Sequence, residues 1–222
     1  MRKTKGQCAY CGVDGVQLER GHILPKSLYP DSRRMLGLQL PTLPECASCN
    51  RGWSDDEAHF RSVLVLAGEP SDPVHELWTT KITPSFRKVD GKRRREDLLK
   101  LLVPAVVDGQ DRKMIYPGRD ERVVRILKKI VRGFSHYRGI EPFIDEERVF
   151  ADVLRYPIAD EFRDSWQFFH CEPDIFKCWY KLFDNGEVSA VWLLTFFERR
   201  EFLVRVSAPG VVLEPPNWGQ VD

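Results

Sequence analysis

Two pairs of cysteines near the N-terminus constrain the fold of this chain more than any other feature. Cys8 and Cys11 form one Cys-x-x-Cys pair, and Cys46 and Cys49 form a second. In a reducing compartment, four thiolates at this spacing are typical of a tetrahedral zinc site; two disulfides or four free thiols are the alternatives. We therefore predict a structural Zn²⁺ that stabilises a segment too poor in apolar residues to build a large core.

The interval between the two cysteine pairs contains a histidine, His22, in the segment 21–26 (Gly-His-Ile-Leu-Pro-Lys). This interval is longer than the roughly 15–20 residues of an ordinary zinc ribbon. A closed four-thiolate site has no open position for a substrate, so any chemistry must come from the insert. Histidine is the usual general base near neutral pH, although a lone histidine is more often structural. Cys171 and Cys178 are predicted to be packed core residues.

The spacing of apolar residues predicts mixed helix and strand. Helices are expected from Ser54 to about residue 67, over residues 71–84 and from Arg122 to Tyr137, where the pattern is most regular. Residues 85–120 are rich in charged residues and are interrupted by Gly and Pro. Strands are expected at 149–154, 175–183, 188–197 and 202–206, with a hairpin turn at Asp184-Asn185-Gly186. We predict an α+β fold with an antiparallel sheet.

The net charge of +1 conceals an uneven distribution, with an excess of basic residues over 81–138 and of acidic residues over 139–222. The basic stretch can bind phosphates, or it can form the solvated faces of amphipathic helices. The sequence contains neither a run of about twenty apolar residues nor an apolar signal segment. We therefore expect a cytoplasmic protein with no membrane partner. No feature predicts an oligomeric state.

In combination, the motifs resemble those of the HNH endonuclease family. The cysteine pairs, the Gly-His-Ile-Leu-Pro-Lys-Ser-Leu segment at 21–28 and the Cys-Asn sequence ending at Asn50 carry the resemblance. Leu-Tyr-Pro at 28–30 and Ser-Asp-Asp-Glu at 54–57 extend it, so that it covers about residues 8–65. It implies a ββα-metal module at residues 1–68. Residues 69–222, a helical region followed by an antiparallel sheet domain, are left without a role.

The resemblance also implies an activity, namely metal-dependent hydrolysis of DNA, most simply double-stranded DNA. His22 would be the general base, and Gln39 would occupy the position that orients it. Asn50 would hold the last ligand position of a catalytic Mg²⁺ or Mn²⁺ ion. On the residues alone, Asn50 is better explained as a helix N-cap or a turn residue, so its role as a ligand rests on the resemblance.

One position departs from the family pattern. The residue before the catalytic histidine normally binds the metal ion, but here it is Gly21, which has no side-chain ligand. Three explanations remain open: a substitute acid, a low metal affinity, or lost catalysis. In the last case the chain would be a catalytically impaired zinc module that binds nucleic acid or protein. The candidate substitutes are Glu19, Asp55, Asp56 and Glu57.

Overall fold

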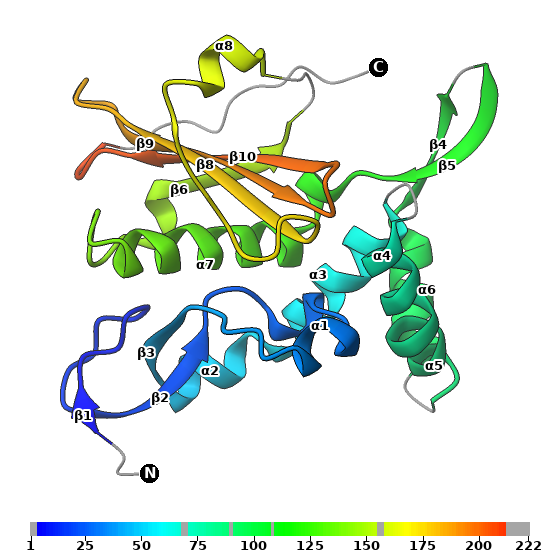
Figure 1. Ribbon diagram of the computed structural model, residues 1–222, viewed down its shortest axis with the longest axis horizontal. Helices are drawn as coiled ribbons and strands as arrows, with labels where there is room; N and C mark the ends of the chain where they lie inside the picture. Colours follow the sequence, from blue (N-terminus) through cyan, green and yellow to red (C-terminus); the bar gives the residue numbers. More distant parts are fainter. Residues whose placement is uncertain (1–3, 68–70, 89–90, 108, 155–157, 212–222) are drawn as a thin grey trace.

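Helices and antiparallel sheets make up this protein, as its sequence predicts. The computed structural model describes residues 4–67, 71–88, 91–107, 109–154 and 158–211. A long helix, α7 (Glu121–Tyr137), lies at the centre. Figure 1 shows the large sheet on one side of α7 and the N-terminal, cysteine-bearing module on the other. None of the described helices has the length and apolar character needed to cross a bilayer.

The N-terminal module consists of three antiparallel strands followed by two helices. The strands lie in the order β1 (Lys5–Gly6), β2 (Val16–His22) and β3 (Thr42–Cys46). The connection from β2 to β3 contains the short helices η1 (Lys26–Leu28) and α1 (Asp31–Met35). Helices α2 (Ala47–Gly52) and α3 (Ser54–Leu66) follow β3 directly. The paired strands β2 and β3 and the helix α2 therefore follow one another along the chain. Helix α3 confirms the helix predicted from Ser54.

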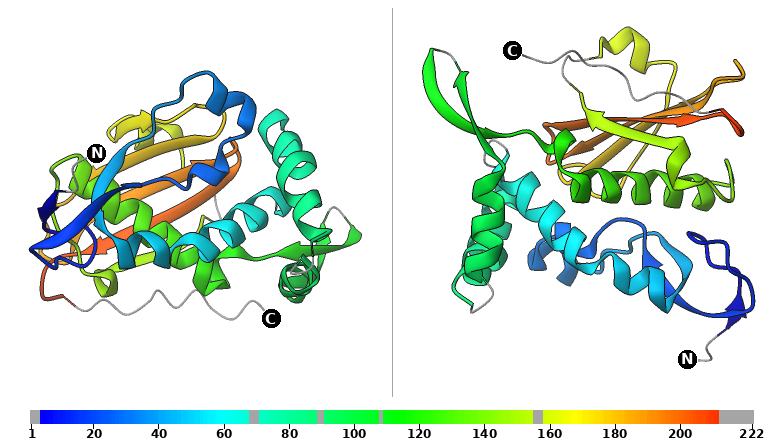
Figure 2. Two further views of the ribbon diagram at one scale, coloured as in Figure 1. Left: turned by 90° about the horizontal axis from the view of Figure 1, so that it is seen from below. Right: turned by 180° about the vertical axis from the view of Figure 1, so that it is seen from behind.

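The middle of the chain contains the helix predicted over 71–84 and further elements that the sequence does not predict. The helical run consists of α4 (Asp72–Leu77), a π-helical turn η2 (Trp78–Ile82) and α5 (Thr83–Phe86), which follow one another without a break. Helix α6 (Gly91–Lys100), the hairpin β4 (Leu102–Val107) and β5 (Gln110–Ile115), and the turn η3 (Pro117–Arg119) follow. Most residues of α6 are charged, so its apolar residues are too few to predict a helix from their spacing. Figures 1 and 2 show the β4–β5 hairpin extending away from the rest of the protein.

The C-terminal part is a five-stranded antiparallel sheet in the order β6-β10-β9-β8-β7. The sequence predicts four of its strands correctly and misses β7 and the short helix α8. In the predicted turn, the Asn185 side chain accepts hydrogen bonds from the Glu187 and Val188 amides, and Gly186 has a φ of +77°. The elements are η4 (Glu146–Arg148), β6 (Val149–Val153), α8 (Asp160–Arg163), β7 (Gln167–His170), β8 (Phe176–Leu182), β9 (Val188–Phe196) and β10 (Arg200–Ser207).

Helix α7 joins the two parts because it is buried on both sides. Asp120 caps its N-terminus by accepting hydrogen bonds from two backbone amides. Toward the sheet, the Phe134 ring stacks on Phe176 with centroids 5.6 Å apart. Toward the N-terminal module, the Arg132 guanidinium donates a hydrogen bond to the Tyr10 carbonyl. One hydrophobic core therefore includes residues from both sides of position 68.

Candidate metal centre and active site

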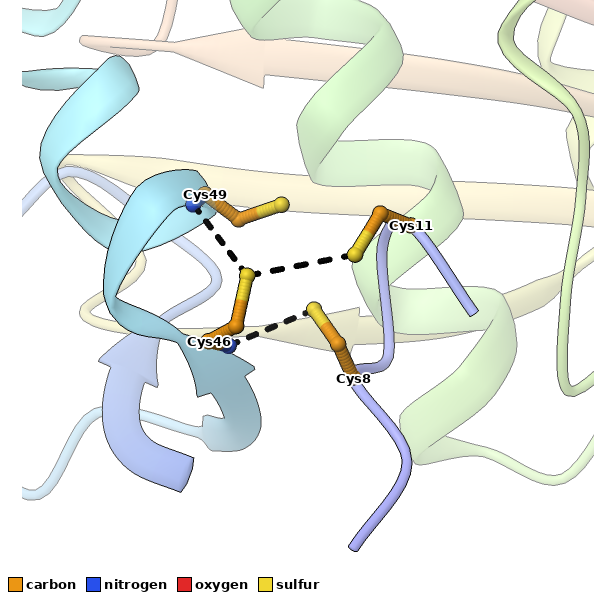
Figure 3. Close-up of side chains that lie close together, drawn as sticks. All are labelled: Cys8, Cys11, Cys46 and Cys49. Carbon is orange, nitrogen blue, oxygen red and sulfur yellow. Dashed lines mark hydrogen bonds between the residues drawn. The ribbon is translucent and has the colours of Figure 1, made fainter. Parts of the chain in front are cut away.

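The two cysteine pairs lie in turns whose backbone amides stabilise them. The Cys8 amide donates to the Val13 carbonyl, and the Gly12 amide donates back to the Cys8 carbonyl, both at 3.0 Å. Gly12 has a φ of +70°, which a residue with a side chain rarely adopts. Cys46 ends β3 and caps α2, and the Cys49 amide donates to the Cys46 thiol. Figure 3 shows the four side chains converging from these two segments.

The sulfur positions fit a tetrahedral metal site. All four Sγ atoms lie within 4.8 Å of one another, and Cys11 and Cys46 are 3.8 Å apart. A zinc–sulfur distance of about 2.3 Å gives a tetrahedron with edges of about 3.8 Å. A disulfide requires a separation of about 2.0 Å, and all six cysteines of the chain are unbonded. The four cysteines can therefore hold a metal ion.

The thiol electrostatics favour a cation at the centre. Burial opposes ionisation of Cys8, but three backbone N–H groups and the Cys11 thiol together lower its pKa to about 7. Burial and the neighbouring thiols raise the pKa of Cys49. Four adjacent thiolates therefore require a metal ion to neutralise them. Burial also raises the thiol pKa values of Cys178 and Cys171, and both pack with the core as predicted.

His22 is the last residue of β2 and is half-buried. Its Nδ1 atom is enclosed and has no hydrogen-bond partner, and its carbonyl accepts a bond of 2.9 Å from the Lys129 ammonium. Burial lowers the pKa of His22 from its usual 6.5, and the positive charges of Lys26, Lys129 and Arg20 lower it further. The lowered pKa favours the neutral imidazole, which can accept a proton.

Gln39 does not lie where the sequence prediction placed it. The predicted hydrogen bond to His22 is absent, because β3 begins at Thr42, the residue paired with His22. Gln39 precedes that strand and therefore lies beyond the end of the hairpin. Its exposed side chain instead lines a hollow of about 600 Å³ near Tyr137 and His170. The structure therefore does not bring Gln39 to the Nδ1 atom of His22, and its orienting role stays a prediction.

Asn50 lies inside α2, whose N-cap is Cys46, so the alternative explanation of Asn50 as a helix cap is wrong. Its Nδ2 atom donates a hydrogen bond of 2.9 Å to the Glu19 carboxylate on β2. The side chain therefore faces the β2–β3 pair, and its Oδ1 atom is left to accept a further contact. The structure thus brings Asn50 next to one of the candidate acids.

The acids at the start of α3 are engaged elsewhere. Asp55, Asp56 and Glu57 lie in the first turn of α3, where they complement the helix dipole as predicted. Asp56 forms an ion pair with Arg125 at 2.5 Å, and Glu57 forms one with Lys129 at 2.7 Å. Asp55 lines a separate hollow. These contacts make them poor substitutes for the ligand that Gly21 lacks.

Sequence reasoning missed Glu45, the most enclosed carboxylate of the module. It lies on β3 opposite Glu19 and is 0% exposed, and the Trp53 indole N–H is close enough to lower its pKa. Burial raises the pKa of Glu45 to about 7, against the opposing influence of Lys129 and Trp53. The overlooked signal was strand alternation, which places Glu45 and Gly21 on the same face of the β2–β3 pair.

Two residues of the basic stretch are used inside the protein. Lys129 and Arg132 on α7 are 2% and 8% exposed and form hydrogen bonds with protein groups, so they do not form part of a phosphate-binding surface. Most other described residues of the stretch are exposed, and three of them, Arg93, Arg94 and Arg122, line a hollow of about 320 Å³ together with Arg61 and the acids Asp55 and Asp97.

Arg61 places a partly buried positive charge in this hollow. Its Nε atom is enclosed and has no hydrogen-bond partner. Burial lowers the pKa of Arg61, and the positive charge of Arg94 lowers it further. An anion in the hollow would relieve both effects. The hollow is therefore a candidate phosphate contact.

Comparison with protein-family models, with curated proteins and with solved structures finds no match for this chain.

Proposed function

We propose that the chain is a metal-dependent endonuclease of the HNH type that hydrolyses phosphodiester bonds in double-stranded DNA. One observation carries the proposal. A half-buried histidine with a lowered pKa ends the first strand of a strand–strand–helix unit whose four cysteines can hold a metal ion. This combination matches what the sequence resemblance implies for His22.

In this proposal His22 removes a proton from a water molecule. The resulting hydroxide attacks the phosphorus, the bond to the 3′ oxygen breaks, and solvent protonates the departing oxygen. A bound Mg²⁺ or Mn²⁺ would stabilise the charge that develops on the phosphate oxygens. The burial and cationic neighbours of His22 keep its imidazole unprotonated at neutral pH, as this step requires.

The metal at the cysteines is proposed to be zinc, with a structural role. A tetrahedral set of four sulfurs favours zinc or iron over hard cations, and it leaves no open position for a substrate. The site ties the segment before β2 to the start of α2. Zinc therefore supports the unit that carries His22 and Asn50 without reacting itself.

Two groups of cations support DNA as the partner. Arg20 and Lys26 are exposed and lie near enough to His22 to lower its pKa. The hollow lined by Arg61 and Arg94 offers a second set of charges. Contacts of this kind hold the backbone and carry no sequence preference, so we expect binding that depends strongly on salt.

Supercoiled plasmid incubated with zinc-loaded protein and Mn²⁺ or Mg²⁺ tests the proposal. The wild type is expected to nick the plasmid, and His22→Ala is expected to lose nicking. His170→Ala is the matched control, because His170 is exposed on β7. Nicking that survives in His22→Ala would refute the proposed mechanism.

A second function, a binding module without catalysis, is favoured by one observation. Gly21 supplies no ligand, and the Lys129 ammonium already bonds to the carbonyl of His22. The two functions make different predictions. A binding module retards DNA in a gel without cutting it under any divalent ion, whereas the endonuclease cuts.

A further inference from the structure

The hollow that Arg61 lines lies on the side of α3 that faces away from His22. Its lining residues on α3 include three that recur at intervals of three and four and therefore share one face of the helix, Asp55, Ala58 and Ser62. Glu57 lies on the opposite face, where it bonds to the Lys129 ammonium that also bonds to the His22 carbonyl. A phosphate group in this hollow is therefore not the one that His22 attacks.

The hollow has an excess of positive charge that its neighbours do not neutralise. Arg122 has a partner in Asp120 at 3.8 Å, and Asp97 has one in Lys100 at 3.5 Å. The remaining lining cations have no ion pair with any residue that the structure describes, namely Arg61, Arg93 and Arg94. Asp55 is the remaining lining carboxylate, so three positive charges face one negative charge.

A phosphate monoester matches this excess better than a phosphate inside a DNA strand does. A monoester carries a charge of about −1.5 to −2 at pH 7 and has three terminal acceptor oxygens. An internal phosphate of DNA carries one negative charge. Guanidinium groups bind phosphate oxygens through paired N–H donors, so a cluster of arginines suits the group with more charge and more acceptors.

The depth of Arg61 also favours the end of a strand. Arg93 and Arg94 are exposed, whereas Arg61 is half-buried and its Nε atom is enclosed without a hydrogen-bond partner. An internal phosphate is flanked by a sugar on each side, so it can contact the two exposed arginines. A terminal phosphate is flanked on one side and can enter a hollow of about 320 Å³ to reach Arg61.

We infer that this hollow binds the 5′-phosphate at the end of a DNA strand, with Arg61 as the contact that requires a free end. The inference rests on the proposed function for the choice of DNA, and it names a strand end as a feature that the protein recognises. The proposed hydrolysis breaks the bond to the 3′ oxygen and therefore leaves a 5′-phosphate. The product of the reaction thus carries the group that fits the hollow.

Fluorescence anisotropy with a short labelled duplex that carries either a 5′-phosphate or a 5′-hydroxyl tests this inference. The zinc-loaded protein is used without Mg²⁺ or Mn²⁺, so that no DNA is cut. The wild type is expected to bind the phosphorylated duplex about tenfold more tightly, as one added charge-assisted hydrogen bond implies. The readout is the ratio of the two dissociation constants, because every arginine also contributes a general attraction that both duplexes share.

Two variants and a matched control identify the residues responsible. Arg61→Met keeps much of the aliphatic volume and removes the charge, so it is expected to abolish the preference for the phosphorylated duplex. Arg94→Ala, at an exposed position on α6, is expected to weaken the same preference without disturbing the core. Arg95→Ala is the control, because Arg95 is exposed on α6 but does not line the hollow, and it is expected to keep the preference. The unfolding temperature of each variant verifies that it is folded.

Three results would overturn the inference. The first is a wild type that binds the two duplexes equally. The second is a preference that survives in both Arg61→Met and Arg94→Ala. The third is a deoxynucleoside 5′-monophosphate that binds as tightly as the phosphorylated duplex, because the hollow would then be a site for a small ligand.

The plasmid assay separates this inference from the proposed function, because a supercoiled plasmid has no strand ends. A wild type that prefers the 5′-phosphate but does not nick the plasmid supports the inference and refutes the endonuclease. A wild type that nicks the plasmid but binds the two duplexes equally supports the endonuclease and overturns the inference.

Discussion

Replacing Lys129 with methionine tests how the interior beside His22 is held together. The Lys129 side chain is 2% exposed, and its ammonium bonds to the Glu57 carboxylate at 2.7 Å and to the His22 carbonyl at 2.9 Å. Methionine keeps much of the aliphatic volume but removes the charge and both hydrogen bonds. Breaking a buried ion pair on one side costs about 3–5 kcal/mol. Because Glu57 is 22% exposed and partly solvated, we expect the lower end, about 3 kcal/mol.

Urea denaturation of the zinc-loaded protein measures this loss, with Glu57→Gln and the double variant completing a thermodynamic cycle. If the two charges stabilise each other, the double variant loses less than the sum of the single losses, with a coupling of at least about 1 kcal/mol. A Lys129→Met loss below about 0.5 kcal/mol, or additive effects, would refute the reasoning.

The same substitution makes a prediction about His22. Lys129 is one of the positive charges that lower the His22 pKa, so its removal is expected to raise that pKa. Proton NMR of the imidazole across a pH series reports the change. An unchanged or lowered pKa would show that the two groups do not interact.

Three further predictions follow from the cysteine site, the His22 pKa and the arginine-lined hollow. Removing zinc with a chelator is expected to lower the unfolding temperature of the whole chain, because the core is shared and a structural zinc contributes on the order of 10 kcal/mol; a melting curve that stays unchanged after zinc loss would contradict this. The folded-state pKa of His22 is lowered, so the unfolded state binds more protons between that pKa and 6.5, and stability is expected to rise with pH across this window; His22→Gln should lose this part of the slope in urea titrations. Arg94→Ala is expected to weaken DNA binding and to reduce the salt dependence by about one phosphate contact, whereas Arg95→Ala, on α6 but outside the hollow, should do neither.

Local patterns in the sequence were sufficient for much of the fold. Cys-x-x-Cys spacing predicts the sulfur cluster, and period-three-to-four spacing predicts α7 because its apolar residues recur on one face of the helix. Alternation and the turn at Asn185 predict most of the large sheet. In each case the signal is a local spacing of residue types, so a single sequence contains it even where the contacts join distant segments, as they do between Cys11 and Cys46.

The rest depends on contacts between distant segments. The arrangement of Glu45 against Gly21 depends on the register of two strands, and the burial of Lys129 depends on how α7 packs against β2. The position of Gln39 outside the hairpin depends on where β3 begins, which the sequence pattern does not reveal. Helix α6 and its hairpin escaped prediction because charged residues and Pro104 interrupt their apolar patterns.

Anomalous diffraction from crystals of the zinc-loaded protein soaked in Mn²⁺ tests the central claim most directly, which is that the residues around His22 bind a catalytic divalent ion. Manganese and zinc have separate absorption edges, so the two sites can be distinguished in one crystal. We predict a zinc peak among the four cysteines and a separate manganese peak near His22 and Asn50. Anomalous density confined to the cysteines would contradict the account.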